Sequence, residues 1–134
     1  MPCDVLCEDK ETTMNTIQHG KWGEEVALEH LIGRGYYLVA RGVRSRFGEI
    51  DLIVKDKNYI VFVEVKTRKN SNFAHAREYV GKGKQRKIIA TASYWLSKRS
   101  YKLQPRFDVI EVYAPDGAET KDPEIIHIDN AFEV

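Results

Sequence analysis

Two neighbouring stretches, GEIDLIVK (48–55) and YIVFVEVK (59–66), most strongly limit the folds open to this chain. Both are rich in the branched and aromatic residues that β-strands prefer. Only the polar junction Asp56-Lys57-Asn58 separates them, which predicts an antiparallel hairpin. Both strands are apolar on both faces, so we expect the hairpin to lie in the centre of a sheet that is covered on each side.

Charged residues inside this hairpin are unusual, because the centre of a sheet is a costly place for a charge. Side chains alternate across a strand, so Glu64 and Lys66 share one face. Glu49 and Asp51 share a face of the partner strand in the same way. If the turn is centred on the polar junction, Asp51 lies opposite Glu64, and Glu49 lies opposite the lysine. A slip of one residue would move one pair to the other face, and the apolar pattern alone does not fix the register.

Two carboxylates this close repel each other, and a divalent cation removes that repulsion. Mg²⁺ (or Mn²⁺) binds carboxylate and carbonyl oxygens, so Asp51, Glu64 and the backbone carbonyl of Val65 are candidate ligands. Such a cation lowers the pKa of water and supplies a nucleophile near neutral pH. Lys66 would stabilise the charge that develops during the attack. A buried structural ion pair is the alternative, because the pattern D-x12-E-x-K is short.

A helix is predicted over residues 16–32, ended by the GRG sequence at 33–35. Its apolar stripe consists of Ala27, Leu28, Leu31 and Ile32. Glu24 falls in the middle of this stripe, and a carboxylate aimed at a core needs a partner. It is therefore a candidate to bind the metal or a water beside it. The alternative is that Glu24 lies in a frayed first turn, where the helix dipole favours a negative charge.

The remaining segments complete an α-β-β-β-α-β-β order. YYLVARGV (36–43) is predicted as a strand before the hairpin, and a long basic loop spans residues 67–83. A second helix is predicted over about residues 84–99, with a buried face formed by Ile88, Ile89, Ala92, Trp95 and Leu96. RFDVIEVY (106–113) and EIIHID (124–129) are the last strands. The expected fold class is α/β of the α+β type, with a mixed central sheet and helices packed on it.

Residues 1–15 have few apolar side chains and carry four acids, so we expect a disordered or artefactual extension, with Met14 as a candidate natural start. Residues 16–134 are expected to form a single domain, because an apolar content of 43% suffices for one core. The chain has no apolar run of about 18 residues and no signal-peptide pattern. Cys3 and Cys7 lack the second ligand pair of a zinc site. These features predict a soluble cytoplasmic protein with reduced thiols and no membrane partner.

The net charge of +1 conceals a strong asymmetry. Residues 66–106 carry twelve Lys or Arg against one acid, whereas residues 107–134 carry one Lys against eight acids. The basic block includes the first turn of the second helix, where positive charge opposes the helix dipole. A polyanionic partner is therefore expected, namely a nucleic acid. DNA is favoured over RNA as that partner, although the charge pattern by itself does not distinguish the two. The candidates to contact the phosphate backbone of the nucleic acid are Arg68, Lys69, Arg77, Lys82, Lys84, Arg86 and Lys87.

Five motifs, GKWGEEVALEHL, GEIDLI, VFVEVKTR, KQRKI and RFDVI, resemble the bacterial YraN-like family over about residues 17–113. The fold of that family is similar to restriction endonucleases and archaeal Holliday junction resolvases, which implies a restriction endonuclease-like domain. By this resemblance, the acidic residues and the lysine of the nuclease active site correspond to Glu24, Asp51, Glu64 and Lys66. Gln85 matches a position on the second helix that supports the site. Gly42 follows Arg41 where the family often has Asn.

Together these observations predict a Mg²⁺- or Mn²⁺-dependent endonuclease, a hydrolase of phosphodiester bonds in DNA, and the family resemblance alone implies structured or branched DNA. The main alternative is a nucleic acid binding module that keeps the fold and does not cleave. A third interpretation is an interaction protein, in which the acidic C-terminal strands of one copy meet the basic block of another. Cutting two strands symmetrically would favour a homodimer.

Overall fold

The structure is a computed structural model that describes residues 11–69 and 80–133, with side chains described from residue 20 onward within these ranges. The elements in chain order are α1 (Glu11–Gly33), β1 (Tyr37–Ser45), β2 (Gly48–Lys55), β3 (Tyr59–Arg68), α2 (Lys82–Ser97), β4 (Gln104–Tyr113), a short 3₁₀ helix η3 (Gly117–Glu119) and β5 (Glu124–Phe132). The predicted element order and the α+β class are confirmed. Cys3, Cys7 and Arg77 lie outside the described residues.

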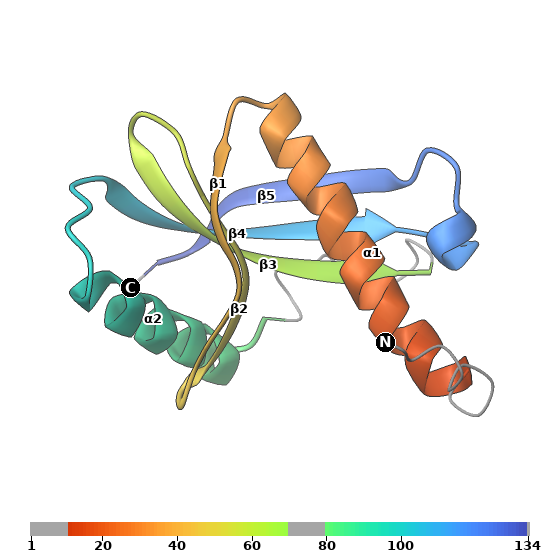
Figure 1. The fold of residues 1–134 in the computed structure, drawn as a ribbon, viewed down its shortest axis with the longest axis horizontal. Coiled ribbons are helices and arrows are strands. Elements are labelled where there is room, and N and C mark those ends of the chain that lie inside the picture. The colour runs from red at the N-terminus through yellow and green to blue at the C-terminus, as the bar shows by residue number, and fades with distance from the viewer. Residues whose placement is uncertain (1–10, 70–79, 134) are drawn as a thin grey trace.

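The five strands form one mixed sheet in the order β1-β2-β3-β4-β5. Neighbouring strands are antiparallel except β3 and β4, which are parallel and are joined through α2. A parallel connection needs a crossover, and the helix supplies it. The helices cover opposite faces of the sheet, so the β2–β3 hairpin is covered on both sides as expected (Figure 1). Within the described residues, neither helix has the length and apolar character that crossing a bilayer requires.

The register of the β2–β3 hairpin is the one centred on the polar junction. Leu52 pairs with Val63, and the next three pairs follow in step down to the turn. The Asp56 carboxylate fixes that turn, because its Oδ1 accepts hydrogen bonds from the backbone N–H groups of Asn58 (2.9 Å) and Tyr59 (2.8 Å). A side chain that binds its own backbone two and three residues later is a typical turn device.

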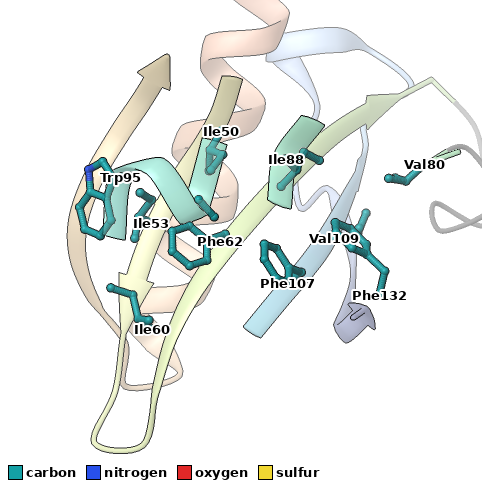
Figure 2. Close-up of a cluster of buried hydrophobic side chains, with 11 residues drawn as sticks. Ile50, Ile53, Ile60, Phe62, Val80, Ile88, Trp95, Phe107, Val109 and Phe132 are labelled. Carbon is teal, nitrogen blue, oxygen red and sulfur yellow. The ribbon is translucent and has the colours of Figure 1, made fainter. Parts of the chain in front are cut away.

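Two buried clusters hold the helices on the sheet. The cluster under α2 consists of side chains from the sheet and from the helix, and Figure 2 shows among them Ile53, Phe62, Phe107, Ile88 and Trp95. The cluster under α1 contains Ala27, Leu28, Leu31, Leu52, Val54, Val61, Val63, Ile110 and Val112. Strands β2 and β3 therefore supply side chains to both clusters, which explains why their sequences are apolar on both faces.

The two helices differ from the predicted ones in three respects: the start of α1, the exposure of Ile32 and the bounds of α2. α1 begins at Glu11, so residues 11–15 are helical, while residues 1–10 lie outside the described part. Ile32 is 53% exposed and does not belong to the buried stripe. At 100° per residue it lies well to the side of Leu31, at the margin of the stripe, and the chain turns away soon afterwards at Gly35 (φ +95°). α2 runs over Lys82–Ser97, two residues earlier at each end than predicted.

Candidate active site

The candidate site lies where β2 and β3 separate, beyond the Leu52–Val63 pair. At this point the Asp51 side chain replaces a backbone partner, since the backbone N–H of Val65 donates a hydrogen bond to Asp51 Oδ2 at 2.8 Å. Ile50 and Ile53 both pack in the cluster under α2, whereas Leu52 packs in the cluster under α1. The alternation of β2 is therefore broken at Asp51, and its carboxylate occupies the opening between the strands.

Two clefts meet at this opening. The α1 cleft, about 420 Å³, is lined by Gly20, Glu24, Asp51, Glu64, Val65, Lys66, Thr67, Arg68, Lys69 and Ala114. The α2 cleft, about 370 Å³, is lined by Gly48, Glu49, Asp51, Glu64, Gly83, Lys84, Lys87 and Ile88. Asp51 and Glu64 line both clefts, so the two carboxylates face a shared space. Glu49 does not meet Lys66, because it forms an ion pair with Arg44 across the β1–β2 hairpin (3.3 Å).

Two ammonium groups converge on Glu64, whose side chain is 8% exposed. Lys84 Nζ lies 2.6 Å from Glu64 Oε2, and Lys66 Nζ lies 3.4 Å from the same oxygen. Burial alone would lower the pKa of Lys84, but its hydrogen bond and attraction to Glu64 outweigh burial and raise it. Burial lowers the pKa of Lys66, and repulsion from Lys84 adds to this effect while Glu64 opposes it. The β3 strand and the α2 helix thus place their charges around one carboxylate.

The other two acids are short of positive charge. Burial, followed by repulsion from Glu64, raises the pKa of Asp51 to about 7, although the Val65 N–H opposes the shift. Burial also raises the pKa of Glu24 on α1, against the attraction of Arg41. The negative charge of Glu24 adds to the raised pKa of Asp51, so these two carboxylates disfavour each other's ionised form. A buried carboxyl group whose pKa is raised in this way is poised to exchange its proton for a cation.

This donor set fits a hard divalent cation. Carboxylate and carbonyl oxygens are what Mg²⁺ and Mn²⁺ prefer, and Asp51, Glu64, Glu24 and Val65 all line the α1 cleft. In the conformation seen here the Lys84 ammonium supplies the positive charge beside Glu64. Among the side chains that the structure describes, no three acids, histidines or cysteines are gathered closely enough to form a ready-made metal group. A cation bound at Glu64 would compete with the Lys84 ammonium for this carboxylate.

The remaining predicted residues fall into two groups. Lys82, Arg86 and Lys87 are exposed on the first two turns of α2, whose first turn has no acid and whose N-terminus has no side-chain cap. Lys69 is exposed at the rim of the α1 cleft. Gln85 is instead directed to the chain before the helix, where its Nε2 donates to the Val80 carbonyl at 2.8 Å. It is not among the described residues that line the two clefts, so its supporting role stays a prediction.

Behind the site lies a buried acid that sequence reasoning missed. Glu111 on β4 is fully buried in register with Lys66, and the Tyr113 hydroxyl donates to its Oε1 at 2.7 Å. Arg68 Nε lies 3.8 Å from its other oxygen, so this arginine is directed inward at the edge of the α1 cleft. Burial and the neighbouring Glu111 raise the pKa of Tyr113 to about 12. The available signal was an acid within the apolar run RFDVIEVY, the same signal that identified Glu64.

A second polar cluster lies outside the two clefts. Asp108 Oδ2 accepts a hydrogen bond from Arg106 (2.8 Å) and lies 2.8 Å from His127 Nε2, while Oδ1 accepts from the backbone N–H of Asn130 (3.0 Å). Burial would raise the pKa of Asp108, but these hydrogen bonds outweigh it and lower the pKa. The His30 ring packs edge-on against His127, with centroids 5.4 Å apart. His127 therefore has a partner that its sequence spacing did not reveal, and the cluster ties β4 to β5.

The fold and the site define an α+β protein in which two acids and a lysine of the central hairpin, together with one acid of α1, lie beside a basic helix start. The sequence profile of the uncharacterised protein family UPF0102 matches residues 23–112, a span that contains every residue of this cluster. A UPF0102 protein of Clostridioides difficile is 42% identical over 120 residues, covering 89% of this chain and 100% of the relative. One of Syntrophotalea carbinolica is 37% identical over 123 residues, covering 91% and 97%. The chain belongs to the UPF0102 family, the YraN-like family that its motifs resemble.

Proposed function

We propose that this chain is a divalent-cation-dependent nuclease that hydrolyses phosphodiester bonds in structured or branched DNA. The observation that carries the proposal is the convergence of Glu24 from α1, Asp51 from β2 and Glu64 from β3 on one opening that also contains Lys66. Acids with raised pKa values in a cleft are typical of functional sites. The motif resemblance to restriction endonuclease-like proteins supports the same reaction, and the choice of branched DNA follows from that resemblance alone.

Each residue has a role that follows from its position. Asp51, Glu64 and the Val65 carbonyl would hold the cation, with Glu24 beside them, and the cation would supply Lewis acidity for attack at phosphorus. Lys66 is partly buried next to Glu64, so its charge is poorly screened and can stabilise the negative charge that builds up on the phosphoryl oxygens. The hydrogen bond from the Val65 N–H holds Asp51 in place throughout.

The start of α2 supplies the phosphate contacts. Its basic residues disfavour the helix when the protein is alone, because they add positive charge to the positive end of the dipole. A DNA backbone along this surface reverses the sign of that effect and also reaches the uncapped N–H groups of the first turn. Lys84, once displaced from Glu64, is placed to pair with a phosphate. Affinity should therefore fall steeply with salt concentration.

The test is cleavage of linear, single-stranded and four-way-junction DNA with Mg²⁺ or Mn²⁺. We expect Asp51→Asn and Lys66→Ala to lose at least about 100-fold in rate, a size typical for groups that stabilise a transition state. Their DNA affinity in EDTA should stay within about twofold of the parent, since neither residue carries the phosphate contacts. Asp129→Asn, an exposed acid on β5, is the matched control and should cleave normally. Cleavage that persists in Asp51→Asn would show that the activity comes from another site.

One observation favours a second candidate, a DNA-binding module that does not cleave. The short Lys84–Glu64 contact already neutralises the best-buried acid of the site. A protein that keeps this ion pair would bind DNA and show no metal-dependent cleavage in the assay above. The third interpretation, pairing through the acidic C-terminal strands, would have to use the exposed acids of that region, because Asp108 and Glu111 are buried and internally paired.

A further inference from the structure

The turn between β1 and β2 carries an aromatic ring and two guanidinium groups that no step above uses. Phe47 at its tip is 39% exposed, and Arg46 Cζ lies 5.0 Å from the centre of its ring. Arg44, two residues before Arg46, is exposed as well. A single exposed aromatic residue is ordinary on a protein surface, so its surroundings must decide what it does.

The turn is held firmly against α2. Ser45 Oγ lies 2.9 Å from Thr91 Oγ1, a buried hydroxyl on the helix, and the backbone N–H of Phe47 donates to the same Ser45 oxygen at 3.0 Å. A Cβ added at Gly48 would lie 3.3 Å from Lys87 Cβ, so the strand start and the helix are in close contact. Figure 1 shows this turn beside the helix (yellow and green). The phenyl ring is therefore presented at a fixed place relative to the basic start of α2.

The turn also adjoins the candidate active site directly. A shallow hollow of about 440 Å³ at the turn is lined by residues 44–49 and Lys87. It shares Gly48, Glu49 and Lys87 with the α2 cleft, which contains Glu64. A DNA strand that runs from Asp51 and Glu64 past Lys87 can thus reach the Phe47 ring without crossing another element of the protein. The negative charge of Glu49 on this path is offset by its ion pair with Arg44.

We propose that Phe47 stacks on an unpaired base of the DNA strand whose phosphate lies at the Asp51–Glu64 opening, with Arg44 and Arg46 contacting the backbone beside it. This proposal rests on the proposed function and adds a substrate class to it. Stacking on an aromatic ring strengthens binding and tolerates any sequence, because every base has a π-face. Bases inside an intact duplex are already stacked, so the preferred substrate is DNA with unpaired bases near the cut, as at flaps, bulges and junctions.

The experiment measures binding in EDTA, where cleavage plays no part. The probes are a labelled single strand, an intact duplex, and the same duplex with one unpaired 2-aminopurine. We expect Phe47→Ala to lose about tenfold in affinity for the first and third probes and less than twofold for the intact duplex. Phe47→Trp should keep the affinity that Phe47→Ala loses.

The matched control is Tyr94→Ala. Tyr94 is an exposed aromatic residue (49%) further along α2, and Lys98 Nζ lies 4.9 Å from its ring centre, so it has the same local chemistry away from the site. It should bind all three probes like the parent. Unchanged affinity of Phe47→Ala for the single strand, an equal loss on all three probes, or an equal loss in Tyr94→Ala would overturn the stacking proposal.

The two proposals fail in different ways. If Phe47→Ala loses the preference for unpaired DNA and no Asp51-dependent cleavage occurs with Mg²⁺ or Mn²⁺, the stacking surface stands and the nuclease proposal falls. If cleavage depends on Asp51 while Phe47→Ala binds every probe normally, only the stacking proposal falls. Absence of DNA binding by the parent protein would overturn both.

Discussion

Replacing Asp51 by Asn should stabilise the metal-free protein above neutral pH and change little below about pH 4. Burial and repulsion from Glu64 raise the pKa of Asp51 from 3.8 to about 7. Between these two values the native protein holds a proton that the unfolded chain has released. The stability of the parent therefore falls as the pH rises through this window, and the loss is complete above pH 7.

The size of this loss follows from the shift in pKa. A difference of roughly three units corresponds to about 4 kcal/mol. The side chain is only partly buried, and solvent screening reduces the figure, so we expect about 2 kcal/mol. The replacement amide still offers an oxygen to the Val65 N–H, so the hydrogen bond that holds the opening is kept. The substitution then removes the charge and little else.

Urea unfolding in EDTA at about pH 3.5 and about pH 8 measures the effect. Asp51→Asn should match the parent at the lower pH and exceed it by about 2 kcal/mol in free energy of unfolding at the higher pH. Asp129→Asn, on the surface of β5, should match the parent at both values. If Asp51→Asn raised the free energy of unfolding equally at both pH values, or lowered it near pH 8, the claim that ionisation of this carboxyl destabilises the folded protein would be refuted.

Three further substitutions probe other parts of the structure. Lys84→Ala should strengthen Mn²⁺ binding in calorimetry, because it removes the ammonium that competes for Glu64, and should lower the salt dependence of DNA binding by about one phosphate contact. Asp108→Asn should reduce the free energy of unfolding in urea by about 3 kcal/mol, since it breaks a buried ion pair, and should leave metal binding unchanged. Gly23→Ala should cost about 1–3 kcal/mol in the same assay, because the added methyl would collide with the Thr67 hydroxyl. Adding Thr67→Ala should restore most of this loss.

Each of these predictions has an outcome that contradicts it. Weaker Mn²⁺ binding in Lys84→Ala would show that this lysine supports the cation rather than competing with it. A melting curve of Asp108→Asn like that of the parent would show that the buried pair contributes nothing. Gly20→Ala is the control for the helix glycine, since a Cβ there meets no atom within 4 Å, and it should stabilise α1 by roughly 0.5–1 kcal/mol. Equal effects of the two glycine substitutions would contradict the steric explanation.

The sheet could be predicted because its local signals agree with its global arrangement. The β2 and β3 runs are apolar on both faces, which requires a covered hairpin, and the structure places a helix on each side of it. The register followed from a turn centred on the polar junction, and Asp56 supplies the hydrogen bonds that set it. The prediction that Ile32 belongs to the buried stripe was wrong, because a residue at the margin of an apolar stripe can face either the core or the solvent.

The site could be predicted only where one strand or one hairpin contains the relevant residues. Glu64 and Lys66 are two positions apart on one strand, and Asp51 lies one position beyond the last pair of the hairpin, Leu52–Val63. The pairing of Lys84 with Glu64 depends on how the crossover helix is placed, which no local pattern specifies. The contact of His127 with Asp108, 19 residues earlier in the chain, likewise depends on the pairing of β4 and β5.

Calorimetric titration of Mn²⁺ into the metal-free protein tests the central claim most directly, with Asp51→Asn and Asp129→Asn titrated alongside. The convergence of Glu24, Asp51 and Glu64 on one opening predicts that the parent and Asp129→Asn bind the cation, while Asp51→Asn binds it at least about tenfold more weakly. Equal binding by all three proteins, or no binding by the parent, would contradict the account.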